Sequence, residues 1–254
     1  TITRRLSQMA RLAAEQLADI VIPPVCLACH EPVTGHDALC ASCWSRITFI
    51  RPPLCDRLGI PLPFDTGGTM ISAAAAANPP IYDRARAVAH YAGDMRDMIL
   101  AFKYGDSHHA RKLFGRWLAA AGCDLIAECD MIAPVPMHPG RLFFRRFNQA
   151  AILAREVARL SNRQFTPQLI SRTRPTIAQV GLSSAQRRRN LAGAFVVPRR
   201  QRRFVDGRRV LIVDDVITTG STLNACARAL RRAGAVGVDA LALGLVTNES
   251  AITL

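Results

Sequence analysis

The sequence predicts an α/β protein with a parallel sheet flanked by helices, preceded by a small cysteine-rich module. Residues 209–213 read RVLIV, a β-branched run typical of a strand buried on both faces of a parallel sheet. Residues 222–233 have helical spacing and end at Gly234, and residues 236–246 form a second apolar strand. A strand, loop, helix and strand of these lengths make a βαβ unit, whose two strands run parallel.

The remaining elements follow from apolar spacing and from proline. Residues 131–135 are a short apolar strand that Pro136 closes, and residues 148–160 have the apolar face of a helix. Near the N-terminus, Pro23 and Pro24 end an amphipathic helical pattern. No internal repeat is evident. We expect four segments: a helix over 1–22, a cysteine-rich module over 23–60, a linker over 61–86 and the α/β domain over 87–254.

The composition favours an anionic ligand. The chain has 254 residues and a formal net charge of +14, from 33 basic and 19 acidic side chains. This charge suits nucleic acid, anionic lipid or phosphorylated small molecules, although arginine-rich chains also arise without such ligands. No stretch approaches the roughly 20 apolar residues that cross a membrane, and Glu15 and Asp19 interrupt the N-terminal apolar pattern. The sequence therefore predicts a cytoplasmic protein that is not an integral membrane protein.

Four of the eight cysteines form two Cys-x-x-Cys pairs, Cys26 with Cys29 and Cys40 with Cys43. In a reducing compartment, closely spaced cysteines act as metal ligands rather than as disulfides. Two such pairs supply the four thiolates of a tetrahedral structural zinc site, and a small segment with little core depends on that metal to fold. The sequence therefore predicts a zinc ribbon over 23–60 with Zn²⁺ bound by these four residues.

The other cysteines have different surroundings. Cys55 begins a similar sequence, but Leu58 stands where the second member of a pair would be, so a complete second zinc site is not expected. Whether Cys55 joins the first site stays open. Apolar neighbours predict that Cys123, Cys129 and Cys226 are core residues.

The main candidate site is the segment 210–223, VLIVDDVITTGSTL. Its strand carries Asp214 and Asp215 to the carboxyl edge of the sheet, where open α/β sheets bind ligands. Because successive side chains point to opposite faces, one carboxylate can face a ligand while the other meets a second hydroxyl, a metal or the loop. The helix that follows attracts phosphate with its N-terminus. The loop between them consists of Thr218, Thr219, Gly220, Ser221 and Thr222. The two carboxylates can accept hydrogen bonds from ribose hydroxyls, and the neighbouring loop can hold a phosphate. Together they match the two parts of a ribose 5-phosphate.

This segment resembles the signature with which the phosphoribosyltransferase family binds 5-phosphoribosyl-1-pyrophosphate (PRPP). The resemblance implies that Asp214 and Asp215 contact the ribose hydroxyls, as the candidate catalytic pair, and that residues 218–222 hold the 5-phosphate. It also implies Mg²⁺ bound with the pyrophosphate, and a phosphoribosyltransferase-type sheet.

From Pro23 to about Val246, the chain resembles the ComF family, competence-associated proteins with an N-terminal zinc ribbon and a phosphoribosyltransferase-like domain. Further matching stretches are Lys103 to Gly105, Pro134 to His138, Arg145 to Ala150 and Thr176 to Phe195. The candidates that they add for pyrophosphate or substrate contacts are Lys103, Val135, Pro136, Arg145, Asn148 and Gln149. Asn148 could equally be the N-cap of its own helix.

Three functions stay open. One is transfer of ribose 5-phosphate from PRPP to an acceptor that the sequence does not identify. A second, which the ComF resemblance implies, is a role in natural transformation, with single-stranded DNA or proteins of the DNA-uptake machinery as partners. Aromatic residues, which base stacking needs, make up only 6% of the chain. A third is a docking role for the zinc ribbon without any transfer. The arginine clusters available to nucleic acid are Arg187–Arg189, Arg199–Arg200, Arg202–Arg203, Arg208–Arg209 and Arg231–Arg232.

Overall fold

The computed structural model describes residues 23–247, apart from residues 66, 105–109, 139, 141, 143–146 and 175–192. The predicted helix over 1–22, Arg145 and Arg187–Arg189 lie outside the described residues. The chain divides into two compact units, Thr1–Arg46 and Ile47–Leu254. None of the helices that the structure describes is long and apolar enough to cross a membrane.

Most of the helices and strands belong to the second unit. In chain order they are α2 (Ala41–Ser45) in the first unit, then α3 (Ala73–Ala77), β1 (Arg84–His90), α4 (Gly93–Tyr104), α5 (Ala110–Ala121), α6 (Cys123–Glu128), β2 (Met131–Pro134), α8 (Gln149–Ser161), β3 (Gln164–Phe165), β4 (Ser171–Arg172), β5 (Phe195–Val196), α10 (Arg199–Val205), β6 (Arg209–Ile217), α11 (Ser221–Arg232) and β7 (Gly237–Leu245). α3 and the start of β1 fall within the segment that was expected to be a linker.

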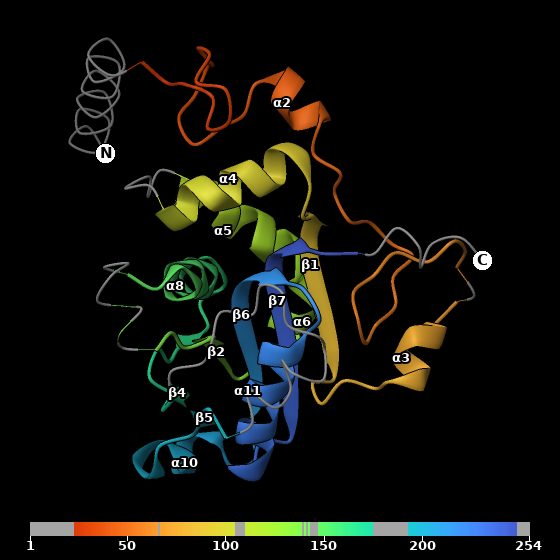
Figure 1. The fold of residues 1–254 in the computed structure, drawn as a ribbon, viewed down its shortest axis with the longest axis vertical. Helices are drawn as coiled ribbons and strands as arrows, with labels where there is room; N and C mark the ends of the chain where they lie inside the picture. The colour runs from red at the N-terminus through yellow and green to blue at the C-terminus, as the bar shows by residue number, and fades with distance from the viewer. Residues whose placement is uncertain are drawn as a thin grey trace, which may run out of the picture. The chain divides into compact units, whose positions relative to one another are not determined.

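The second unit is built on a five-stranded parallel sheet with the strand order β1-β7-β6-β2-β3 (Figure 1). Successive side chains of a strand point to opposite faces. Ile212 of β6 packs with Leu223 and Cys226 of α11 in one apolar cluster. On the other face, Leu241 of β7 lies against Gly122, between α5 and α6, and α8 packs on β6 and β2. Helices therefore cover both faces, as predicted for this fold class.

The predicted βαβ unit is present as β6, α11 and β7. β6 extends beyond the predicted strand to Ile217, because Asp214 and Val216 continue the ladder with β7. α11 ends as predicted, with Gly234 in the left-handed region at φ +98°.

Two of the three predicted core cysteines are buried. Cys129 and Cys226 lie in the interior, whereas the prediction for Cys123 was wrong. Cys123 is the first residue of α6 and is exposed, because this short helix turns Leu125 and Ile126 toward the interior instead.

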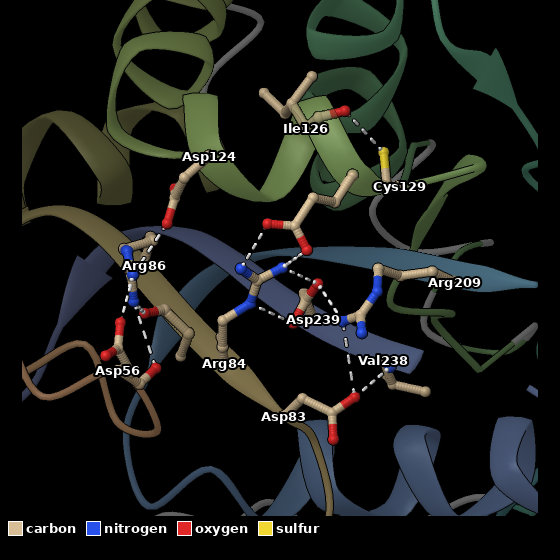
Figure 2. Close-up of polar contacts among 12 residues, drawn as sticks. Asp56, Asp83, Arg84, Arg86, Asp124, Ile126, Cys129, Arg209, Val238 and Asp239 are labelled. Carbon is tan, nitrogen blue, oxygen red and sulfur yellow. Dashed lines mark hydrogen bonds and ion pairs between the residues drawn. The ribbon is translucent and has the colours of Figure 1, made fainter. Parts of the chain in front are cut away.

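An ion-pair network closes the amino ends of the strands (Figure 2). Asp239 of β7 is fully buried and accepts hydrogen bonds from two arginines on the neighbouring strands. Arg84 of β1 reaches it at 3.2 and 3.0 Å, and Arg209 of β6 at 3.0 Å. Arg84 also forms two bonds to Glu128, at 2.9 and 2.8 Å. The buried carboxylate thus joins three strands at their N-terminal ends.

Replacing Asp239 with Asn should lower the free energy of unfolding by about 3 kcal/mol, since it leaves two arginines beside a neutral buried amide. The control is Asp97→Asn, whose carboxylate is 73% exposed and pairs loosely with Arg96 at 3.8 Å. That change should stay within about 0.5 kcal/mol. Urea unfolding followed by circular dichroism measures both, and equal effects of the two substitutions would contradict a structural role for Asp239.

Candidate functional site

The two carboxylates of the candidate site lie on opposite faces of the sheet, near the carboxyl end of β6. Asp215 points toward α4 and forms an ion pair with Lys103, with 3.2 Å between Nζ and Oδ1. Asp214 points toward α11, where burial and the charge of Asp214 together raise the pKa of the Cys226 thiol. Strand alternation, which the sequence predicted, therefore separates the two carboxylates and gives each a different neighbour.

Asp214 differs from an ordinary surface carboxylate in its proton affinity. Burial, and second the negative charge of Asp215, raise the pKa of Asp214 to about 8. The backbone N–H of Asp215 donates to Asp214 at 2.9 Å, and Lys103 lies near enough to favour the ionised form, but these do not offset burial. The raised pKa means that this carboxyl group keeps its proton near neutral pH.

The phosphate-loop candidate connects β6 to α11. Gly220 has φ +67° and is the N-cap residue of α11. Because glycine has no side chain, no capping hydrogen bond reaches the first turn of the helix from this position. The Thr219 and Ser221 hydroxyls lie 2.8 Å apart and face the same region. Free N–H groups and a positive dipole end at a helix N-terminus favour an anion. The loop therefore has the features that a phosphate requires.

Two residues that the sequence did not single out support this loop. The N–H of Ile81 donates to Asn224, in the first turn of α11, at 2.6 Å. A Cβ atom at Gly220 would lie 3.2 Å from the hydroxyl of Tyr82, a side chain that is almost fully buried and whose pKa burial raises to about 12. No local pattern could have predicted these contacts, because Ile81 and Tyr82 precede β1, far from α11 in the chain.

The candidates from the turn after β2 have backbone roles. The N–H of Val135 donates to Val213 at 2.9 Å, and Pro136 has no N–H, so neither offers a backbone donor to pyrophosphate. Asn148 caps α8 by accepting from the N–H of Ala150, and it donates to the carbonyl of Val135 at 3.0 Å. The alternative of an N-cap for Asn148 is therefore correct, and these three residues shape the turn.

Gln149 connects this turn to the lysine. Its side chain is 1% exposed and donates to the backbone carbonyl of Lys103 at 2.8 Å. Its Oε1 atom is buried and has no hydrogen-bond partner among the described residues. Gln149 therefore fixes the end of α4 from which Lys103 reaches Asp215, and keeps one acceptor unused.

The first unit brings the four predicted zinc ligands together. The thiol sulfurs of Cys26, Cys29, Cys40 and Cys43 all lie within 4.8 Å of one another. Tetrahedral zinc with bonds of about 2.3 Å places its sulfurs about 3.8 Å apart, and the Cys29 and Cys40 sulfurs are 3.7 Å apart. The backbone N–H of Cys40 points at the sulfur of Cys26 at 3.3 Å, as thiolate ligands require. These residues fit a structural Zn²⁺ ion, and no other such cluster occurs among the described residues.

Two of the four arginine clusters that the structure describes are engaged in ion pairs. Arg208 pairs with Asp130, Arg209 with Asp239 and Arg231 with Asp83. The other two clusters lie on α10, whose four arginines are all exposed. In the part of the chain that the structure describes, no acidic side chain pairs with them. The arginines of α10 are Arg199, Arg200, Arg202 and Arg203.

Comparison with known protein families divides the chain in the same way. Residues 17–75 match a double zinc ribbon domain, and residues 150–244 match the phosphoribosyl transferase domain. Together with the observed parallel sheet, the second match identifies a phosphoribosyltransferase-type fold. Among solved structures, that of the allosteric regulatory enzyme of purine biosynthesis is 22% identical over 57% of this chain and 30% of that chain, with a TM-score of 0.39.

Two groups of curated relatives match most of the chain. The DNA utilization protein YhgH of Escherichia coli (strain K12) is 33% identical over 87% of this chain and 96% of its own length. Competence protein F of Haemophilus influenzae is 30% identical over 82% of this chain and 91% of its own length. The chain therefore belongs to the ComF family and combines a zinc ribbon with a phosphoribosyltransferase-like domain.

Proposed function

We propose that this chain binds PRPP at the carboxyl end of β6 and acts in DNA uptake or utilisation in the cytoplasm. The observation that carries the proposal is the position of Asp214 and Asp215 directly before the phosphate-loop candidate and the N-terminus of α11. Ribose hydroxyls donate to carboxylates, and the 5-phosphate accepts from backbone N–H groups, so one ligand would use both features. Relatives named for competence and DNA utilisation support the cellular role.

In this proposal each residue has a definite task. Asp214 and Asp215 hold the ribose, and Thr218, Thr219, Gly220, Ser221 and Thr222 surround the 5-phosphate. Lys103 moves from Asp215 to an oxygen of the pyrophosphate, and Gln149 keeps the lysine in place through its backbone. Arg145 lies outside the described residues and stays a candidate for pyrophosphate. Mg²⁺ bound with the pyrophosphate would neutralise part of its charge.

Binding of PRPP with Mg²⁺ should be saturable in calorimetry and at least about 100-fold weaker in an Asp214→Asn/Asp215→Asn variant, since two charge-assisted contacts to the ribose are lost. Asp97→Asn is the control, because it removes an exposed acidic charge outside the site. Wild-type protein with full zinc content that shows no heat of binding would contradict the proposal. If PRPP does bind, release of pyrophosphate in the presence of nucleobases would show that the site also catalyses transfer.

The raised pKa of Asp214 predicts that PRPP affinity depends on pH. Below its pKa of about 8, the carboxyl must lose its proton to accept a ribose hydroxyl, so affinity should rise about tenfold per pH unit toward 8 and then level off. Calorimetry at pH 7 in buffers of different ionisation enthalpy should show release of nearly one proton. An affinity that stays flat between pH 7 and 9 would contradict this assignment.

The same shift sets the sign of its effect on stability. The folded state binds the proton of Asp214 more tightly than the unfolded chain does. The contribution of Asp214 to the free energy of unfolding is therefore present at low pH and is lost as pH rises through about 8. Asp214→Asn should remove that part of the pH dependence in urea unfolding.

A second candidate function is direct contact with single-stranded DNA, favoured by the exposed arginines of α10. Phe204 follows them on the same helix and is 41% exposed, and the guanidinium of Arg203 lies 4.7 Å from its ring centroid. Exposed cations beside an exposed aromatic ring suit a single strand, whose phosphates and bases need both.

Replacing Arg202 and Arg203 with alanine should weaken single-stranded DNA binding and lower the salt slope of log K by about 1.4, since each phosphate contact on a single strand contributes about 0.7. The matched control is Arg111→Ala/Arg228→Ala on α5 and α11, which removes two other exposed arginines that pair with no acidic side chain among the described residues. Fluorescence anisotropy over a salt series measures both. Equal losses in the two variants would indicate attraction by net charge alone.

A further inference from the structure

A second segment of the chain repeats the backbone of the first zinc ribbon. In the first ribbon, the N–H of Cys26 donates to the backbone carbonyl of Glu31 at 2.8 Å, and the N–H of His30 donates to the backbone carbonyl of Cys26 at 2.9 Å. In the second segment, the N–H of Cys55 donates to the backbone carbonyl of Ile60 at 2.8 Å, and that of Gly59 donates to the backbone carbonyl of Cys55 at 2.7 Å. The turn residues His30 and Gly59 both have positive φ, 63° and 68°. Each turn is flanked by one antiparallel bridge, Val25 with Pro32 and Leu54 with Pro61.

The second half of each ribbon is also the same. The N–H of Cys40 points at the sulfur of Cys26 at 3.3 Å, and the N–H of Ser72 points at the sulfur of Cys55 at 3.2 Å. Cys40 and Ser72 are the N-caps of five-residue helices, α2 and α3, with φ, ψ of −69°, 160° and −67°, 155°. Each accepts a hydrogen bond from the N–H three residues on. The interpretation that the chain has no internal repeat was therefore wrong.

This correspondence assigns the four ligand positions of the second ribbon. The zinc ligands Cys26, Cys29, Cys40 and Cys43 correspond in order to Cys55, Leu58, Ser72 and Ala75. Only one of these four is a thiol, two have no donor atom, and the hydroxyl of Ser72 caps α3. The match to a double zinc ribbon implies two metal sites, but the second set does not fit a zinc ion.

Contacts with the edge strand β1 stabilise the second ribbon instead. The carbonyl of Asp56 accepts from the N–H of Ala85 at 3.1 Å, and the Asp56 carboxylate pairs with Arg86 at 2.8 Å. A Cβ at Gly59 would come within 2.6 Å of the carbonyl oxygen of Ala85, so only glycine allows this approach. Arg57 donates to the carbonyl of Pro80 at 2.7 Å. The turn that would hold a metal is therefore packed against the sheet.

The same contacts reach the candidate PRPP site. Pro80, which Arg57 holds, lies two residues before Tyr82, and the hydroxyl of Tyr82 lies beside Gly220. The second ribbon therefore supports the residue against which the phosphate loop packs.

We infer that the second ribbon is a metal-free copy of the first that covers the edge of β1, so that the chain binds a single Zn²⁺ and its phosphoribosyltransferase-like unit folds without metal. Three side chains, Leu58, Ser72 and Ala75, separate this copy from a zinc site. The inference does not depend on PRPP binding, because it rests on the backbone of the two ribbons and on their ligand positions.

The zinc content of the purified full chain tests the inference directly. Mass spectrometry of the metal should find about one Zn²⁺ per chain. Cys55→Ser should leave that content unchanged, whereas Cys26→Ser should lower it. About two Zn²⁺ per chain, or a loss of zinc in Cys55→Ser, would overturn the inference.

A restored ligand set provides the second test. The triple variant Leu58→Cys/Ser72→Cys/Ala75→Cys should raise the content to about two Zn²⁺ per chain, since the backbone already has the geometry of a ribbon. Leu58→Cys/Ser72→Cys/Ala74→Cys, with the third cysteine shifted by one residue, is the matched control and should hold the second ion less tightly in competition with a chelator. A triple variant that melts cooperatively but binds one zinc would overturn the assignment.

Chelation of the wild-type protein tests whether the phosphoribosyltransferase-like unit folds without metal. Removal of zinc should leave the main thermal unfolding transition in place, because the second ribbon and the sheet contain no metal ligand set among the described residues. Loss of that transition on chelation would show that the larger unit needs metal, and would overturn the inference.

Discussion

The burial of β6 between β2 and β7, with helices on both faces, is the constraint on which the rest of the structure depends. An unpaired charge along the middle of such a strand would cost several kcal/mol, so Val210 to Val213 carry none and are fully buried. Charged side chains occur only at the two ends of the strand, with Arg209 at the start and Asp214 and Asp215 near the end. The chemistry of the unit is therefore divided between the two edges of the sheet.

The two edges satisfy their charges in different ways. At the amino ends, Asp239 is enclosed by Arg84 and Arg209, and every member has a protein partner (Figure 2). At the carboxyl ends, Asp215 pairs with Lys103, whereas burial raises the pKa of Asp214 to about 8. The first edge is complete without a ligand, and its role is to join strands. The second carries an acidic pair beside a helix N-terminus that no side chain caps, and the proposed PRPP site rests on this arrangement.

How much could be predicted from the sequence follows from the range of the interactions involved. The clustering of the four cysteines and the position of Asp214 to Thr222 between β6 and α11 were predictable, because each is local and short spacing fixes the geometry. Partners that come from distant segments, such as Asp239 with Arg84 or Gly220 with Tyr82, leave no local pattern. The second ribbon was missed for another reason, since a zinc-ribbon repeat is recognised by its cysteines and only one of the four ligand positions here holds a cysteine.

The two ribbons show that one backbone can be stabilised by two different means. In the first, four thiols converge on one point, an arrangement that needs a cation because four thiolates repel one another. In the second, Cys55 and Ala75 are as buried as Cys26 and Cys43, so the interior is filled without a metal. What the ion contributes in the first ribbon, β1 supplies in the second through the backbone of Ala85 and the guanidinium of Arg86. Because the sheet edge holds this turn, the second ribbon keeps its backbone with only one cysteine at its four ligand positions, and the turn is part of the unit that carries the acidic pair.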